Sequence, residues 1–370
     1  MQTKRKLDKE HAHIMFVTPS MNYGGAERVM SILMNELINN GFKISLVCLN
    51  DTPVVVYQLS PLIEIHYLKG VRFNKVKAFL SPIHQLRRVM KVLRPDVIVS
   101  FFNNTSCFSW LAQLGLNIPI IFSERNDPTH NIKGLNARFF QKWALTISNK
   151  IVFQTQGAKS LYKSRSIQNK SVVIYNPLNI SNKSANVSEK CYKLVSVGRL
   201  SSQKNQKVLI DAIARISSSY PDLTLTIFGE GNLRTNLEQQ IKNLGLTGKV
   251  LLPGNESNVI DKIIDYRLFV FSSDYEGIPN ALLEAMSIGL PCVSTDCSPG
   301  GAKEFINNYE NGILVPCNDA EAMSNAIEFH LQNPEKSLLM GKNAISISKL
   351  LDVGVIVKKW MSLFDSIEIK

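Results

Sequence analysis

Short apolar runs alternate with amphipathic helical patterns along the whole chain, and this alternation limits the possible folds more than any other feature. A short apolar run bounded by polar residues is typical of a buried strand, and apolar residues at i, i+3, i+4 and i+7 are typical of a packed helix. The runs lie at residues 13–18, 43–49, 97–101, 118–122, 151–155, 172–175, 192–197, 223–228, 250–252, 268–271 and 291–294. Strands separated by helices form parallel sheets with right-handed crossovers. The sequence therefore predicts doubly wound α/β domains.

A polar segment separates two groups of these strand–helix units. Residues 181–190 have the sequence SNKSANVSEK, which is typical of a linker. With 370 residues, the chain is long enough for two domains that each have a core. We predict a first domain over residues 1–180, a second over residues 181–350, and a C-terminal helical segment over residues 351–370.

Basic residues are concentrated in the first half of the chain. Residues 1–180 contain 23 Lys and Arg against 9 Asp and Glu, residues 181–370 contain 19 against 21, and the whole chain has a formal net charge of +12. Such an excess attracts anions, either nucleic acid or a membrane surface rich in acidic lipid, and its plainer explanation is a solubilising surface. No base-reading signature is visible, so we expect a membrane surface and no nucleic acid.

The segment 69–94 carries eight of these basic residues and no acid. Its apolar residues Leu86, Val89, Met90 and Leu93 recur at helical spacing, which predicts a basic amphipathic helix. Its interleaved cations are Arg87, Arg88, Lys91 and Arg94. The commoner explanation is a helix packed on the sheet. Apolar residues just before it, among them Phe73, Phe79 and Leu80, make membrane contact a second hypothesis.

Composition and the N-terminus predict a cytoplasmic protein. No apolar run is long enough to span a bilayer, and residues 14–17 are too few for the apolar core of a secretory signal. The six cysteines are scattered without a C-x-x-C pair or a histidine cluster, which favours a reduced chain and no metal site.

The stretch 267–288 is the strongest candidate for a functional site. A predicted strand at 268–271 is followed by a polar loop with Glu276, and Glu284 falls in the helix after it. Ligands of open parallel sheets bind at the carboxyl ends of the strands, where both carboxylates would converge. The alternative is that Glu276 is a solvated loop residue and that Glu284 faces water.

Three further loops follow predicted strands. Gly24 and Gly25 precede a helix and could present backbone N–H groups to a ligand, or could serve packing alone. Arg199 and Lys204 flank the loop before another helix and could clamp a diphosphate without a metal, or could be exposed cations. Polar residues after the strand at 118–122, beginning with Glu124 and Arg125, mark a possible wall of a site.

The string S-x-x-E-G-x-P-N-A-x-x-E-A-M over residues 273–286 resembles the signature of retaining glycosyltransferase family four. The strings G-G-A-E-R-V from Gly24 and G-R-L with Q-K-N from Gly198 resemble its donor-side loops. The resemblance covers the chain from Gly24 to about Val315. It implies the GT-B arrangement, in which two Rossmann-like domains face a cleft and a C-terminal helix crosses back to the first domain. The first domain would bind the acceptor and the second the nucleotide-sugar.

The resemblance also implies roles for individual residues. Arg199 and Lys204 would hold the diphosphate, and Glu276 would contact the transferred sugar near its reacting face. These three residues would act in catalysis, and Glu284 would bind the ribose hydroxyls. The donor-binding residues implied are Gly24, Gly25, Arg199, Lys204, Gly229, Glu276, Gly277, Ile278, Pro279, Asn280 and Glu284. Many relatives carry a histidine on the acceptor side. This sequence has Glu124 and Arg125 there, with His130 slightly later.

The activity implied is retaining transfer of a hexose or N-acetylhexosamine from a nucleotide diphosphate sugar, of the uridine type, to an acceptor linked to polyprenyl diphosphate. Surface polysaccharide or glycan assembly at the inner membrane face is the setting implied. Cations would stabilise the leaving diphosphate, and no D-x-D motif is present, so we expect no cofactor and no obligatory metal.

Three other functions remain open on the sequence. A two-carboxylate glycoside hydrolase leaves the cations and the glycine loops unexplained. A nucleotide-sugar epimerase of the same fold would differ by releasing an altered free sugar. A nucleic-acid-binding protein would bind polynucleotide with a steep salt dependence and would not bind nucleotide-sugars.

Overall fold

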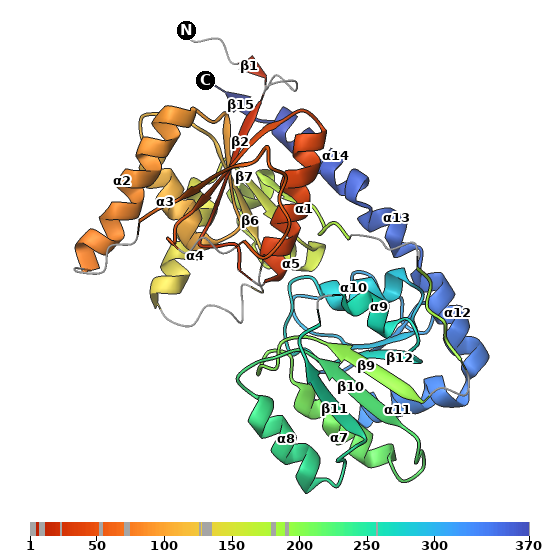
Figure 1. Ribbon diagram of the computed structural model, residues 1–370. Coiled ribbons are helices and arrows are strands. Elements are labelled where there is room, and N and C mark those ends of the chain that lie inside the picture. Colours follow the sequence, from red (N-terminus) through yellow and green to blue (C-terminus); the bar gives the residue numbers. More distant parts are fainter. Residues whose placement is uncertain are drawn as a thin grey trace. The chain divides into compact units, whose positions relative to one another are not determined.

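The computed structural model describes residues 5–6, 12–22, 24–51, 55–69, 75–125, 127, 135–178, 183–188, 192–256 and 258–369, with backbone alone at 5–6, 75–79, 135–137 and 368–369. The chain forms two compact units (Figure 1). Unit 1 comprises Met1–Pro177 together with Leu351–Lys370, and unit 2 comprises Leu178–Leu350. Each unit is an α/β body around one parallel sheet.

The sheet of unit 1 has seven parallel strands in the order β4-β3-β2-β5-β6-β7-β8 within the described residues. Its strands are β2 (His13–Thr18), β3 (Lys43–Cys48), β4 (Glu64–Tyr67), β5 (Val97–Ser100), β6 (Ile120–Glu124), β7 (Lys150–Phe153) and β8 (Ser171–Val173). Its helices are α1 (Gly25–Asn39), α2 (Lys75–Leu93), α3 (Asn103–Gln113), α4 (Leu135–Ile147), α5 (Gln156–Ser160), α6 (Arg165–Asn169) and α14 (Val353–Asp365). The short strands β1 (Arg5–Lys6) and β15 (Glu368–Ile369) pair antiparallel.

The sheet of unit 2 has six parallel strands in the order β11-β10-β9-β12-β13-β14 within the described residues. Its strands are β9 (Lys193–Val197), β10 (Thr224–Phe228), β11 (Val250–Gly254), β12 (Leu268–Phe271), β13 (Cys292–Thr295) and β14 (Ile313–Val315). Its helices are α7 (Gln206–Ile216), α8 (Arg234–Asn243), α9 (Val259–Ile263), α10 (Asn280–Ser287), α11 (Ala320–Gln332) and α12 (Pro334–Ala344). Helix α13 (Ile347–Leu351) ends at the boundary with unit 1.

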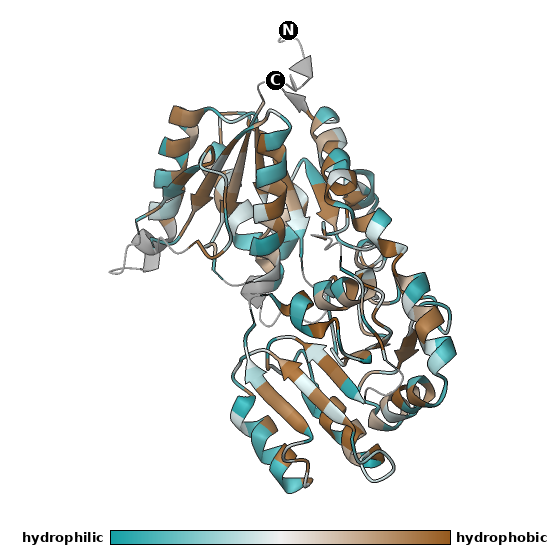
Figure 2. Ribbon diagram, turned by 45° about the vertical axis from the view of Figure 1, so that its right-hand side comes forward, coloured by the Kyte–Doolittle hydropathy of each residue, from teal (hydrophilic) through white to brown (hydrophobic). Residues whose placement is uncertain are grey.

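Strand β2 shows why the sequence folds into layers. Its residues alternate between two clusters: Ile14 and Phe16 join the cluster under α1 and α14, whereas Met15 and Val17 join the cluster under α2 and α3. Because side chains of a strand point to opposite faces, a strand covered by helices on both sides must be apolar throughout. Figure 2 shows the strands of both sheets largely in brown and the helices with brown and teal residues.

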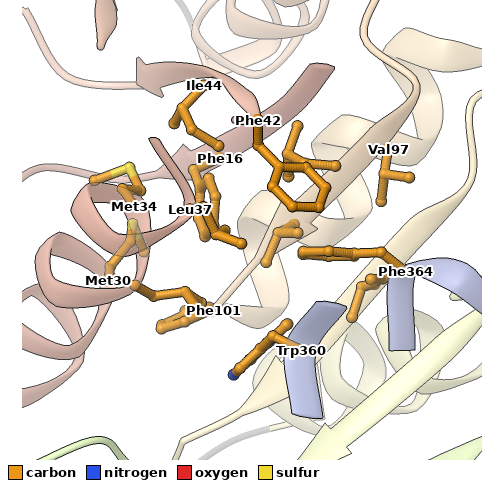
Figure 3. Packing of buried hydrophobic residues seen from close by; sticks show 14 of the residues in the cluster. Phe16, Met30, Met34, Leu37, Phe42, Ile44, Val97, Phe101, Trp360 and Phe364 are labelled. Carbon is orange, nitrogen blue, oxygen red and sulfur yellow. The ribbon is translucent and has the colours of Figure 1, made fainter. Parts of the chain in front are cut away.

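Helix α14 supplies part of the core of unit 1. Ile356, Val357, Trp360 and Phe364 of this helix are buried in the same cluster as Phe16. The Trp360 ring stacks on Phe101 with centroids 6.2 Å apart (Figure 3). The last helical segment of the chain therefore completes the core of unit 1.

Candidate functional site

Both sheets reverse their strand order at one point. In unit 2 the chain moves outward from β9 to β11 and then returns to place β12 on the other side of β9. Loops that leave two adjacent strands in opposite directions open a crevice at the carboxyl edge. In unit 2 these loops are 198–205 and 272–279, and they carry most of the residues expected to bind the donor.

The structure brings Lys204 and Glu276 together at this edge. Lys204 Nζ forms an ion pair with Glu276 Oε2, and the two side chains are only 19% and 16% exposed. Lys204 Nζ also lies 4.8 Å from the centroid of the Phe271 ring. Gln203 Nε2 and Ser273 Oγ each lie 3.5 Å from the same carboxylate oxygen. The sequence predicted a separate ligand for each of the two residues and did not predict this pair.

The two loops hold each other in place through several hydrogen bonds. The Ser272 hydroxyl donates to the Lys204 carbonyl at 2.8 Å, and the Asp274 N–H donates to the Gln203 carbonyl at 2.9 Å. Asn205, which is left-handed with φ of 43°, donates through Nδ2 to Asp274 Oδ1 at 2.8 Å. Lys204 is therefore held on a loop with little freedom, immediately before α7.

Arg199 is placed differently from Lys204. Its side chain is exposed, while its carbonyl accepts a hydrogen bond from Gln206 Nε2 at 2.8 Å. The expected two-cation clamp thus consists of one mostly buried cation and one exposed cation in this structure.

Two glycines let neighbouring loops closely approach the loops that carry Lys204 and Glu276. Gly229 has φ of 147°, and a Cβ there would lie 2.1 Å from the Gly198 carbonyl oxygen. A Cβ on Gly301 would lie 2.4 Å from the Gly277 carbonyl oxygen, beside the Glu276 N–H, which donates to the Ser298 carbonyl at 2.9 Å. Side chains at these positions would displace the loops that carry Lys204 and Glu276. Gly229 therefore has a packing role that the sequence did not indicate.

Glu284 lies on α10 and is 4% exposed, so the alternative that it faces water is wrong. Its neighbours Leu283 and Ala285 are fully buried, and Ile278 in the preceding loop is 5% exposed. Pro279 is the N-cap of α10, and the helix begins at Asn280. Glu284 therefore lies inside unit 2, on the helix that follows the loop carrying Glu276.

In unit 1 the glycine loop lies at the corresponding point of the strand order, where β5 returns beside β2. Gly24 is the N-cap of α1. Its N–H donates to the Tyr57 hydroxyl at 3.2 Å, and that hydroxyl donates to the Gly24 carbonyl at 2.9 Å. Tyr57 was not singled out from the sequence, and in this structure it takes the Gly24 N–H that was expected to bind the donor.

Glu124 and Arg125, the expected wall residues on the acceptor side, are both buried. Strand β6 continues to Glu124, two residues beyond the expected end at Phe122. Glu124 is 4% exposed and Arg125 is 8% exposed. Gln141 Nε2 donates to Glu124 Oε2 at 3.2 Å. His130 lies outside the described residues.

The Arg125 guanidinium is held by an amide and an aromatic ring. Its Nη1 donates to Asn176 Oδ1 at 2.6 Å, and its central carbon lies 3.7 Å from the centroid of Phe101. Burial lowers the pKa of Arg125 to about 9, and the charge of Glu124 partly opposes this. Phe101 in turn stacks on Trp360 of α14, so Arg125 is connected through this ring to the C-terminal helix.

Helix α2 uses its apolar face inside unit 1. Leu86 and Met90 are buried against the sheet, and Val89 and Leu93 pack against the same cluster. Arg87 Nη1 donates to the carbonyls of residues 112 and 114, both at 2.7 Å. The packed-helix explanation is therefore confirmed for residues 86–93, and Arg87 is committed to α3. Phe73 and the side chain of Phe79 lie outside the described residues.

An exposed aromatic side chain lies on α4, which the sequence analysis did not single out. Phe139 is 62% exposed and stands between the exposed cations Arg138 and Lys142. Helix α4 packs beside α3, and α3 packs beside α2. Exposed apolar residues on α2 and α4 include Leu80, Val92 and Phe139, and the exposed Leu114 directly follows α3. The adjacent Phe pair flanked by cations was the signal in the sequence.

Two absences concern only the described part of the chain. There, no three His, Cys, Asp or Glu side chains gather as a metal-binding group. The same residues include no helix with the length and apolar character needed to cross a bilayer.

Two parallel-sheet α/β units, each with a reversal of strand order, are the architecture of GT-B proteins. A family model for glycosyl transferases group 1 matches residues 179–346, and one for Glycosyltransferase Family 4 matches residues 23–182. Together the matches span both units, and the chain belongs to the GT-B glycosyltransferases.

Several curated relatives match nearly the whole chain. An uncharacterized glycosyltransferase of Haemophilus influenzae is 28% identical over 92% of this chain and 96% of its own length. An N-acetyl-D-galactosaminyltransferase of Campylobacter jejuni, named for an undecaprenol diphosphate-linked acceptor, is 26% identical over 96% of this chain and 99% of its own length. Among solved structures, Anabaena HepE in complex with UDP-glucose has a TM-score of 0.81 at 19% identity, covering 96% of this chain and 100% of its own.

Proposed function

We propose that this protein is a retaining glycosyltransferase of family four that transfers a hexose or N-acetylhexosamine from a UDP-sugar to a lipid-linked glycan. The observation that carries the proposal is the cluster at the carboxyl edge of β9 and β12, where mostly buried Lys204 and Glu276 meet beside the helix that carries buried Glu284. Support comes from neighbours of known structure with UDP or UDP-glucose bound and from curated relatives named for sugar transfer.

In the proposed mechanism, Lys204 and Arg199 stabilise the negative charge that develops on the leaving diphosphate. Lys204 is suited to this because its loop is fixed by Ser272 and Asp274, so little reorganisation is needed when the charge develops. Glu276 contacts the transferred sugar and Glu284 contacts the ribose. Same-face substitution, assisted by the leaving diphosphate, would retain the anomeric configuration.

We also propose that transfer requires no divalent cation, because two cationic side chains can take the role of a metal at the diphosphate. Activity that persists in excess EDTA would support this. Full loss in EDTA, with recovery on adding Mg²⁺ or Mn²⁺, would contradict it.

For the acceptor, we propose a glycan linked to polyprenyl diphosphate, because two Campylobacter jejuni relatives are named for undecaprenol diphosphate-linked acceptors. Such an acceptor lies at a membrane surface. A peripheral membrane location at the inner face is therefore part of the proposal, with the surface of α2, α3 and α4 as the contact. Its exposed Phe139 and Val92 lie among exposed basic residues that include Arg88, Lys91 and Arg138.

A screen of nucleotide-sugars tests the donor part of the proposal. A ligand that binds only the folded protein raises the melting temperature by mass action. We expect one UDP-sugar to stabilise the protein, and we expect the Lys204→Ala variant to lose that stabilisation. If no nucleotide-sugar of any base stabilises the protein at millimolar concentration, the proposal is wrong.

A further inference from the structure

Lys204 is expected to bind the diphosphate of the donor and Glu276 its sugar, yet in this structure the two side chains form an ion pair with each other. From this contact we infer that Glu276 is a specificity-determining residue: it competes with a diphosphate for Lys204 and thereby makes the site prefer a nucleotide that still carries its sugar. This inference rests on the proposed function and concerns the same site.

The described contacts make Lys204 the main support of the Glu276 carboxylate. A single oxygen, Oε2, receives the lysine, while Gln203 Nε2 and Ser273 Oγ approach it only at 3.5 Å. Both charged side chains are mostly buried. A buried carboxylate that loses its cation bears a large desolvation cost unless other donors replace it.

Lys204 can leave the carboxylate without losing every contact. Its ammonium already lies 4.8 Å from the Phe271 ring centroid, and its backbone is held by the Ser272 hydroxyl at 2.8 Å. A diphosphate arriving at the loop can therefore take over the ammonium while the loop stays in place. Glu276 is then the group left without its cation.

Two ligands leave Glu276 in different situations. A free nucleoside diphosphate takes Lys204 and offers nothing to the carboxylate. A nucleotide-sugar also brings hydroxyl groups, and hydrogen bonds from hydroxyls to a carboxylate are among the stronger ones. The sugar thus compensates Glu276 for the loss of Lys204. After transfer, the product nucleoside diphosphate again competes with Glu276, which favours its release.

The test is calorimetric titration of the intact protein. UDP, GDP and ADP are first titrated into the wild type, and the nucleotide that binds is then titrated into each variant. Glu276→Gln removes the competing charge and keeps the side-chain size. We expect it to bind the free nucleotide about tenfold more tightly, which corresponds to about 1.4 kcal/mol. Glu276→Ala provides a second variant with the same expected direction.

Two controls separate competition from general charge effects. Glu321→Gln removes a carboxylate from an exposed ion pair with Arg215 in the same unit and should leave nucleotide affinity unchanged. In the double variant Lys204→Met with Glu276→Gln, the gain should disappear, because no lysine remains to be released. The nucleotide-sugar that stabilises the wild type should bind Glu276→Gln no more tightly than before.

The possible outcomes distinguish the inference from the proposed function. If both Glu276 variants melt cooperatively and bind the free nucleotide no more tightly than the wild type, the inference is wrong. The proposed donor site is not affected by that result. A tenfold gain that persists without Lys204 also overturns the inference. If the wild type binds none of the three nucleotides and no nucleotide-sugar, the proposed function is wrong.

Discussion

Lys204 lies on a fixed loop and forms an ion pair with Glu276, a residue that also acts in the proposed reaction. Replacing Lys204 removes a charge-assisted contact with the diphosphate, worth about 1.5–3 kcal/mol. We expect Lys204→Ala to weaken UDP and UDP-sugar binding alike. Lys207→Ala, at an exposed position in α7, serves as the control and should bind normally. Unchanged UDP affinity in folded Lys204→Ala would remove Lys204 from the site.

His330 connects stability to pH. It is fully buried, accepts or donates one hydrogen bond with Ser337 at 2.8 Å, and lies near Arg267, which donates to its carbonyl. Burial, helped by the charge of Arg267, lowers the pKa of His330 to about 3. In the unfolded chain, His330 takes up a proton below the ordinary histidine pKa of about 6.5, whereas in the folded state it stays neutral until the pH is much lower. Stability is therefore complete above pH 6.5 and falls as the pH decreases toward 3.

Urea unfolding at pH 7.5 and 4.5 measures this dependence. His330 should account for a loss of about 2–3 kcal/mol between these values, since each unit of proton linkage is worth about 1.4 kcal/mol. His330→Gln should reduce the loss, while His13, whose pKa burial also lowers, continues to contribute. An equal loss in the variant would show that other groups control it.

Individual contacts were harder to predict from the sequence than residue types. The carboxylates and cations of the candidate donor site lie at the strand ends where the pattern placed them. The Lys204–Glu276 pair and the contact of Tyr57 with Gly24 were not predicted, because both join residues far apart in the chain. The sequence placed Glu124 and Arg125 after a strand, but it could not show their burial, which depends on residues far along the chain such as Asn176.

At the scale of elements, strongly periodic segments were predicted well. The predicted strands at 13–18 and 268–271 have the same bounds in the structure. Strands β4 and β14 were not predicted. Both lie at the edges of their sheets and are short, and β4 mixes polar and apolar residues that are mostly half-buried. An edge strand needs less burial, so it leaves a weaker pattern.

Helix α14 offers an element-scale prediction, because it closes the core of unit 1 from the end of the chain. Trp360 is 1% exposed and contacts both Phe101 and Phe364. We expect Trp360→Ala to lower the free energy of unfolding by about 3–5 kcal/mol through the cavity that it leaves. Val355→Ala, at an exposed position of the same helix, should have little effect. A small effect of Trp360→Ala in chemical denaturation would show that α14 is dispensable to the core.

The whole molecule consists of two units with different charge, since the excess of basic residues lies in residues 1–180. The proposed membrane contact follows from this asymmetry and from the exposed Phe139 between Arg138 and Lys142. Each basic residue near an anionic surface contributes about 1 kcal/mol, and salt screens it. We therefore expect sedimentation with anionic vesicles at low salt and release at high salt.

Matched variants locate this contact. Arg138→Gln with Lys142→Gln should reduce sedimentation, and Phe139→Ser should reduce it further. The control variant, Lys207→Gln with Lys242→Gln, removes the same amount of charge from unit 2 and should leave sedimentation unchanged. Equal sedimentation with neutral vesicles would show that charge does not recruit the protein, and no sedimentation at all would leave the basic surface a solvated one.

The most direct measurement is sugar transfer itself. Purified protein is incubated with radiolabelled UDP-sugars and a membrane lipid extract that contains polyprenyl-diphosphate-linked glycans, and label is counted in the lipid phase. We expect the wild type to transfer label from one UDP-sugar, with retained anomeric configuration in the product. The Lys204→Ala variant should transfer none at the same concentrations. Transfer that is unaffected by Lys204→Ala, or a product with inverted configuration, would contradict the proposed function.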